Sequence, residues 1–176
     1  MATLFGILAL VLFPLVLIRA AIGDLTTMKI PNRLVLVLLL GYGALAPLSG
    51  HSLLHIGQSA AAAVAVFAIA MIVYACGWMG AGDVKLLAVS ALWLGIAHVP
   101  ALLLYTSVFG CLLTAGLLLF RAMPLPDSWH RHAWPVRLHT KDTQVPYGVA
   151  IASAALLLFI TTSWMAPLQV VRSGFR

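Results

Sequence analysis

The chain has four acidic residues, all of them aspartates, and two of these, Asp24 and Asp83, lie at the edges of long apolar segments. A carboxylate at the edge of a hydrocarbon phase costs several kcal/mol unless water, a partner or snorkelling relieves it, so each is a functional candidate. Two carboxyl groups that meet can hydrolyse a peptide. The ionised group takes a proton from water while the protonated group polarises the carbonyl, and repulsion between the two favours this singly protonated state.

The composition predicts an integral membrane protein. Of the 176 residues, 63% are hydrophobic and 8% are charged, and the mean hydropathy is +1.09. This is more apolar surface than a globule of this size can bury in one core. We therefore expect an all-α polytopic protein, with residues 1–176 forming a single membrane domain.

Six apolar segments approach the length of about 20 residues that a helix needs to cross a bilayer. They are residues 3–21, 34–50, 59–77, 82–98, 101–120 and 147–166. Residues 86–120 contain no Asp, Lys or Arg, but one helix there would be about 52 Å long, beyond the hydrocarbon thickness. His98 and Pro100 predict a turn that divides this stretch into two spans.

The positive-inside rule predicts that the N-terminus is outside. With six spans, the cytoplasmic side then holds Arg19, Lys29, Arg33, Lys85, Arg121, Arg131, Arg137 and Lys141, against Arg172 and Arg176 outside. Two complete spans separate Asp24 from Asp83, so both face the cytoplasm. The many alanines of residues 59–77 favour close helix packing that could bring the two together. The net charge of +6 indicates contact with anionic lipid headgroups and not with nucleic acid.

Two short motifs accompany the aspartates. Residues 80–85 read Gly-Ala-Gly-Asp-Val-Lys, and residues 29–32 read Lys-Ile-Pro-Asn. Glycines at 80 and 82 tolerate positive φ and leave room for an approaching peptide, whereas Pro31 disfavours helix before it and Asn32 can cap the second span. Each motif alone is equally consistent with an ordinary turn or a capped loop.

Taken together, the order of these motifs resembles the prepilin peptidase family of GxGD-type aspartyl membrane proteases. Residues 145–152, Val-Pro-Tyr-Gly-Val-Ala-Ile-Ala, are also similar to that family, particularly to its short members that serve tight-adherence (Flp-type) pili. The resemblance implies a peptidase that removes the leader of type IV pilin-like precursors at the cytoplasmic face of the bacterial inner membrane, with Asp24 and Asp83 catalytic. Pilus or secretion assembly components are further possible partners.

Larger family members also methylate the new N-terminus and carry a domain with paired CxxC motifs. This chain contains no CxxC, so we expect no methyltransferase domain, and we expect no cofactor. The residues expected to bind substrate or shape the site are Gly80, Gly82, Lys85, Lys29, Pro31, Asn32, Pro146, Tyr147 and Gly148.

Several of these residues also have a simpler interpretation. Lys29 and Lys85 could contact lipid phosphate or set topology, and Tyr147 could be an interfacial anchor. The helix dipole predicts different roles for the two aspartates: Asp83, at a helix N-terminus, as the base, and Asp24, following a helix C-terminus, as the acid.

Other polar residues do not predict a metal. His130, His132 and His139 share a loop with Asp127 and Asp142, but without a thiol or a defined helical spacing. Two further function classes stay open. One is a proton-coupled small transporter or channel subunit, in which the aspartates relay protons. The other is a non-enzymatic assembly factor of a secretion or pilus apparatus.

Overall fold

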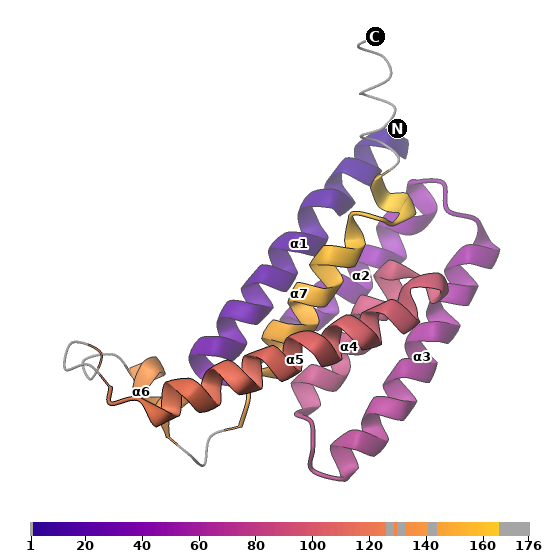
Figure 1. Ribbon diagram of the computed structural model, residues 1–176. Coiled ribbons are helices and arrows are strands. Elements are labelled where there is room, and N and C mark those ends of the chain that lie inside the picture. The colour runs from indigo at the N-terminus through magenta and orange to yellow at the C-terminus, as the bar shows by residue number, and fades with distance from the viewer. Residues whose placement is uncertain (1, 126–128, 130–132, 141–143, 166–176) are drawn as a thin grey trace.

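The computed structural model describes residues 2–125, 129, 133–140 and 144–165, and this part of the chain is helical, without a strand. Its helices are α1 (Ala2–Thr27), α2 (Asn32–Leu48), α3 (Leu53–Ala75), α4 (Ala81–Leu94), α5 (Val99–Ala122), α6 (Ala133–His139) and α7 (Tyr147–Phe159), with 3-10 turns at Ile96–His98 and Ser163–Met165. The expected all-α class is confirmed (Figure 1).

Helix α4 is the centre of the bundle. Eleven of its fourteen residues are buried, from Asp83 to Leu94 with only Lys85 excepted. It packs extensively on α3 and α7 and also on α2. At about 1.5 Å per residue α4 is about 21 Å long, shorter than the hydrocarbon layer of about 30 Å. Because α4 is buried, its neighbouring helices and not lipid cover it, and it can be shorter than the hydrocarbon layer.

The break between α4 and α5 confirms that residues 86–120 form two helices. It falls at Gly95, three residues before the expected position at His98. Gly95 has φ 81°, in the left-handed region that glycine enters without the steric cost of a side chain. Pro100 then lies in the first turn of α5, where proline fits because no helical N–H partner is lost.

Aromatic side chains hold together the end of the bundle where α4 finishes. The ring centroids of Phe13 and Trp93 are 5.0 Å apart, and those of Trp93 and Trp164 are also 5.0 Å apart. Trp93 Nε1 donates to the carbonyl oxygen of Leu38, and Trp164 Nε1 donates to that of Trp93, both at 2.9 Å. These bonds satisfy the only polar atom of each buried indole and link α2, α4 and the 3-10 turn after α7.

Within the described part of the chain, three helical stretches are long and apolar enough to cross a membrane: Thr3–Thr27, Leu53–Ala75 and Ile96–Ala122. Two shorter apolar helices, Asn32–Leu48 and Tyr147–Phe159, accompany them. Large apolar side chains such as Leu40, Ile69 and Leu118 are exposed on their outer faces. This surface suits lipid and identifies a membrane protein.

The helix ends differ from the expected spans in three places. Helix α1 continues six residues past the expected end at residue 21, and α3 begins six residues before residue 59. Helix α7 ends at Phe159 and not near residue 166. Hydropathy averaged over the length of a membrane span cannot locate such helix ends. Helices continue through polar residues, and short buried helices need not span the bilayer.

Candidate active site

Asp24 lies inside α1, whose last residue is Thr27, so the expectation that it follows the helix was wrong. Its side chain is only 6% exposed. One carboxylate oxygen, Oδ2, accepts a hydrogen bond of 2.8 Å from the backbone N–H of Gly148, 124 residues further along the chain. Asp24 therefore lies at the N-terminal end of α7 as well as near the C-terminal end of its own helix.

Asp83 lies in the first turn of α4 and is 8% exposed. Its Oδ2 accepts a hydrogen bond of 3.3 Å from the backbone N–H of Gly80, the residue that caps this helix. Asp83 also interacts electrostatically with Asp24 and with the backbone N–H of Gly148. The two carboxyl groups thus share one neighbourhood, in which the Gly148 amide is common to both.

The helix that brings the aspartates together is α7. It packs extensively on α1, which carries Asp24, and on α4, which carries Asp83. The expected close packing by the alanine-rich third span occurs, but between α3 and α4, on the far side of α4 from α1. That expectation about how the carboxylates meet was therefore wrong.

A cavity of about 550 Å³, here called the site cavity, opens between the loop after α1 and the start of α4. It is lined by Asp24, Met28, Lys29, Ile30, Pro31, Asn32, Gly80, Ala81, Gly82, Asp83, Lys85, Gln144 and Val145. Eight of the eleven residues expected at the site line it, and they include both aspartates. A volume of this size accommodates a short extended stretch of peptide.

Three glycines of the site have close neighbours: a side chain would be crowded at Gly80 and Gly82 and would clash at Gly148. A Cβ at Gly80 would lie 3.0 Å from Asp83 Oδ2, and one at Gly82 would lie 3.1 Å from Ile30 Cβ. A Cβ at Gly148 would lie 2.7 Å from Asp24 Oδ2. Gly80 and Gly82 do not have the positive φ that they could tolerate. Among the described residues, the glycines with positive φ are Gly50, Gly77 and Gly95.

Lys85 and Asn32 join the two motifs directly. Lys85 Nζ donates a hydrogen bond of 2.9 Å to Asn32 Oδ1 at the rim of the site cavity. The residue before α2 is Pro31, and no side chain caps this helix, so the expected cap by Asn32 was wrong. Lys29 lines the same rim.

Pro146, Tyr147 and Gly148 lie at the start of α7. Pro146 precedes the helix and is fully buried, while the ring of Tyr147 lies over Gly110 of α5, where a Cβ would be 2.8 Å away. Tyr147 lines a smaller space of about 100 Å³, here called the side cleft, together with Gly80 and Asp83. Gly148 contacts Asp24 without lining the site cavity.

The site cavity is also lined by residues that were not expected to shape the site, although Ile30, Ala81 and Val145 stand in the motifs: Met28, Ile30, Ala81, Gln144 and Val145. Ile30 fills the space beside the glycines, since its side chain would meet a Cβ at either Gly82 or Gly148. Its position before Pro31 was the only available signal. Met28, with φ 54°, ends α1 and turns the chain toward Ile30, and its backbone N–H donates to the carbonyl oxygen of Asp24.

The surroundings of the two aspartates do not support different roles based on helix ends. Each carboxyl group accepts a hydrogen bond from a backbone N–H at a helix N-terminus, Asp83 from that of α4 and Asp24 from that of α7. The dipole argument for Asp83 as base and Asp24 as acid therefore no longer distinguishes them.

The histidine-rich loop lies partly outside the described residues. This applies to Asp127, His130, His132 and Asp142, so the structure says nothing of them. Among the residues that are described, no group of three or more His, Cys or carboxylate side chains is arranged to hold a metal ion.

Fold and site together define a class: an apolar helical protein of the membrane with two buried aspartates facing one cavity. The family model described as "Type IV leader peptidase family" matches residues 11–115, which is more than half of the chain and includes both aspartates. The chain belongs to the type IV leader peptidase family. The start of α7 lies outside the matched range, so its place in the site depends on the contact between Gly148 and Asp24.

Similar proteins agree with this membership. The chain is 34% identical over 136 residues to a prepilin leader peptidase/N-methyltransferase of Aeromonas hydrophila, covering 69% of this chain and 45% of that protein. It is 29% identical over 161 residues to a protein of the same name from Bacillus subtilis, covering 89% of this chain and 58% of that one. The chain thus spans about half the length of the relatives it matches. No solved structure is a significant match.

Proposed function

We propose that this protein is a membrane-embedded aspartyl endopeptidase that removes the leader peptide of type IV pilin-like precursors. The observation that carries the proposal is the convergence of Asp24 and Asp83 on one cavity from segments 59 positions apart. The names of the relatives, prepilin leader peptidase/N-methyltransferase, support the substrate class. That methyl transfer is absent from this chain stays a prediction.

The chemistry needs only water and the two carboxyl groups. Like charges at close range favour a pair that holds one proton, so one aspartate activates a water molecule and the other donates a hydrogen bond to the scissile carbonyl. Attack gives a tetrahedral intermediate. Transfer of a proton to the leaving nitrogen then breaks the C–N bond and releases the leader and the new N-terminus. The pair titrates as a unit.

A purely structural role for the aspartates is the simplest competing explanation. Both carboxyl groups accept backbone N–H bonds at helix N-termini, and capping alone would keep them in place. Capping does not require that two acids share a cavity of about 550 Å³. Asparagine caps a helix about as well as aspartate, which allows the two roles to be separated by Asp→Asn substitution.

A proton relay remains the alternative from another class, because buried carboxyl groups in a membrane protein can carry protons. The site cavity is at one end of the bundle, and the opposite end of α4 is closed by the packed aromatic side chains of Phe13, Trp93 and Trp164. Tyr42 and His51 also pack against these rings, so a relay would have to pass through them. The cleavage reaction needs access from one side only, which is what the cavity offers.

We further propose six membrane helices, α1 to α5 and α7, with the N-terminus outside and the site cavity on the cytoplasmic side of the inner membrane. The two shortest, α4 and α7, have the largest share of buried residues, eleven of fourteen and eight of thirteen, so they need not match the lipid thickness. Lys29, Arg33 and Lys85 would then lie at the cytoplasmic surface, near anionic headgroups.

The proposal is tested by co-expressing the protein with each pilin-like precursor encoded in the same genome and mapping N-termini by mass spectrometry. The expected result is a new N-terminus between the basic leader and the apolar helix. The control is an Asp24→Asn, Asp83→Asn double variant that accumulates in the membrane at the wild-type level. Processing by this variant at the wild-type rate would contradict the proposal.

A further inference from the structure

We propose that a groove between α3 and α5 holds the apolar helix that follows the cleaved bond of the substrate. This α3–α5 groove has a volume of about 320 Å³. Its lining includes Val66, Ile69 and Val73 from α3, Leu87 from α4, and Val99 and Leu103 from α5. The inference rests on the proposed function, since it assigns a place to one half of the proposed substrate.

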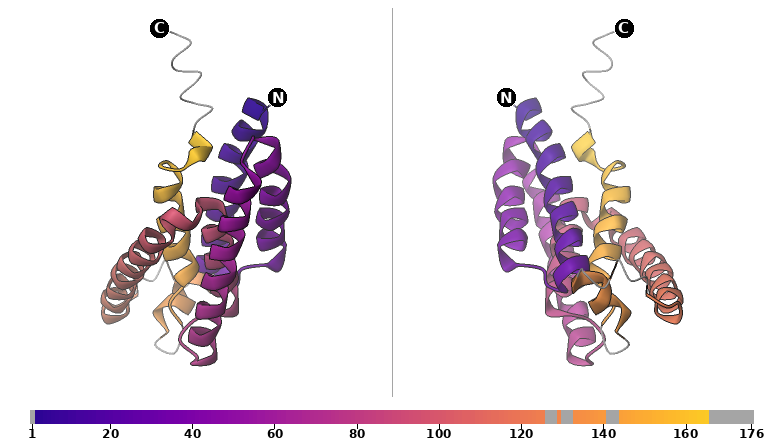
Figure 2. Two further views of the ribbon diagram at one scale, coloured as in Figure 1. Left: turned by 90° about the vertical axis from the view of Figure 1, so that its right-hand side faces the viewer. Right: turned by 90° about the vertical axis from the view of Figure 1, so that its left-hand side faces the viewer.

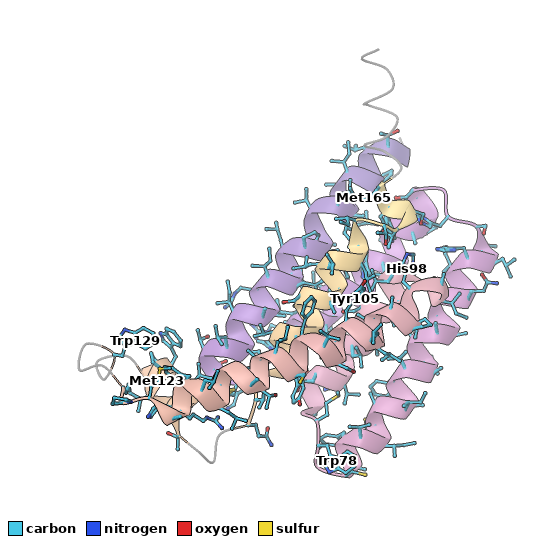
Figure 3. The ribbon with its side chains drawn as sticks, in the orientation of Figure 1. Trp78, His98, Tyr105, Met123, Trp129 and Met165 are labelled. Atoms are coloured by element: carbon cyan, nitrogen blue, oxygen red, sulfur yellow. The ribbon has the colours of Figure 1, made fainter. Side chains whose placement is uncertain are left out.

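The groove arises because α3 and α5 diverge. Helix α3 packs extensively on α4, whereas α5 packs mainly on α7 and only slightly on α4, and α3 and α5 hardly contact each other. Figure 1 shows α5 running away from α3 toward α6. Figure 2 shows the same divergence from the sides, with α5 projecting from the rest of the bundle. Leu87 of α4 lies between α3 and α5. The two helices separate toward the α3–α4 turn, where Trp78 lies in Figure 3. This is the end of α4 that carries Asp83.

The groove is continuous with the candidate active site. Gly80 and Asp83 line both the site cavity and the side cleft, and Met79 lines both the side cleft and the α3–α5 groove. A chain whose scissile bond lies over Asp83 would therefore have one flank in the site cavity. The other flank would pass Met79 into the groove.

The two ends of this path differ in polarity, as the two halves of the proposed substrate do. The site cavity presents polar groups such as Asn32 and Lys85, which suit a hydrated leader. The groove between α3 and α5 is lined only by apolar residues and alanines, which suit a membrane helix. Alanines in the wall, among them Ala62 and Ala65, allow a helix backbone to approach closely.

A second groove, between α2 and α3, fits this helix less well. It is smaller, about 210 Å³, and its lining includes the charged side chain of Lys85. It also shares no residue with the side cleft, so it receives a chain only from the rim of the site cavity. The Nζ of Lys85 itself bonds to Asn32 at the rim of the site cavity, so a chain entering this groove would have to pass that charged group.

Three alanines of α3 provide test variants; Ala65 and Ala68 are exposed, and Ala63 is partly buried against the core. Ala65 lines the α3–α5 groove, Ala63 lines the α2–α3 groove, and Ala68 lines neither. Ala65→Trp is expected to slow cleavage of a full precursor at least about tenfold by filling the space that the helix needs. Ala63→Trp and Ala68→Trp are expected to leave that rate unchanged. A short peptide that ends a few residues past the cut should be cleaved equally by all three.

Photo-crosslinking tests occupancy directly. A photoreactive residue replaces Ile69, which lines the groove, or Ile72, which lines neither groove, in an Asp83→Asn variant that retains uncleaved precursor. The two positions are matched in exposure, at 62% and 66%. Crosslinks from position 69 to the precursor helix, with few from position 72, support the proposal.

The outcomes separate the two proposals. If the wild type cleaves precursors but Ala65→Trp cleaves them equally fast, the groove assignment is wrong and the peptidase assignment stands. Crosslinks from position 69 to lipid or to a second copy of the chain alone also overturn the groove. If Ala63→Trp is the slow variant and its thermal unfolding matches that of the wild type, the helix uses the other groove. A wild type that cleaves no precursor refutes the proposed function and this inference with it.

Discussion

Gly148→Ala tests the geometry on which the account depends. A Cβ at this position would lie 2.7 Å from Asp24 Oδ2 and 2.7 Å from Ile30 Cδ1. Ordinary contact begins near 3.4 Å, so each group must move by about 0.7 Å or α7 must shift. Either movement stretches the 2.8 Å hydrogen bond from the Gly148 N–H to Asp24 toward the limit at which such bonds are lost.

The expected consequence is a fall of about 100-fold in the rate of cleavage, since a misplacement on the order of 1 Å at a reacting group typically costs that much. Loss of a hydrogen bond to a buried carboxyl group corresponds to about 1.5–3 kcal/mol. Folding should survive, because alanine favours helix over glycine. The assay is the initial rate of precursor cleavage in reconstituted vesicles, with thermal unfolding in detergent measured alongside it.

Gly43→Ala in α2 is the matched control, because a Cβ there meets no atom within 4 Å. It should cleave at the wild-type rate. The reasoning is refuted if Gly148→Ala, folded and inserted, also cleaves at the wild-type rate, because Asp24 would then not depend on the start of α7 for its position.

Three further experiments test other parts of the structure. Lys85→Met and Asn32→Ala each remove the 2.9 Å hydrogen bond across the rim of the site cavity, so each should slow cleavage several-fold. The double variant should be no slower than either single variant. Additive effects on the rate would show that the two residues act separately. Gly82→Ala places a Cβ 3.1 Å from Ile30 Cβ. It should slow cleavage about tenfold, because the displacement is smaller than that at Gly148. An unchanged rate would show that Ile30 moves aside without affecting the site. Trp93→Ala removes a buried ring and should lower the free energy of unfolding, measured by thermal unfolding, by about 3–5 kcal/mol. A change below about 1 kcal/mol would contradict the role of Trp93 in the packed end of the bundle.

The pairing of the aspartates could be predicted because it depends on order along the chain. Two apolar segments lie between Asp24 and Asp83, so the chain returns to the same end of the bundle. This prediction needs only the number of apolar segments. The motifs at residues 29–32 and 80–85 narrow the site further. Eight of the eleven expected residues do line the site cavity, because short loops keep sequence neighbours together in space.

The role of α7 could not be predicted in the same way. The hydrogen bond from Gly148 to Asp24 joins residues 124 apart, and no local pattern encodes such a contact. Helix ends were misplaced for a related reason: Gly95 interrupts an apolar stretch with no change in polarity around it, and α1 runs on through Asp24 to Thr27. Backbone geometry and packing, and not hydropathy, decide these positions.

The most direct measurement is the cleavage rate of the Asp24→Asn and Asp83→Asn single variants, each reconstituted with precursor in vesicles and compared with the wild type. Asparagine is nearly the same size and still caps a helix, but it cannot exchange a proton as a carboxyl group does. The account predicts that each variant inserts and unfolds like the wild type and yields no new N-terminus. Cleavage at the wild-type rate by either variant would contradict the claim that both carboxyl groups perform the reaction.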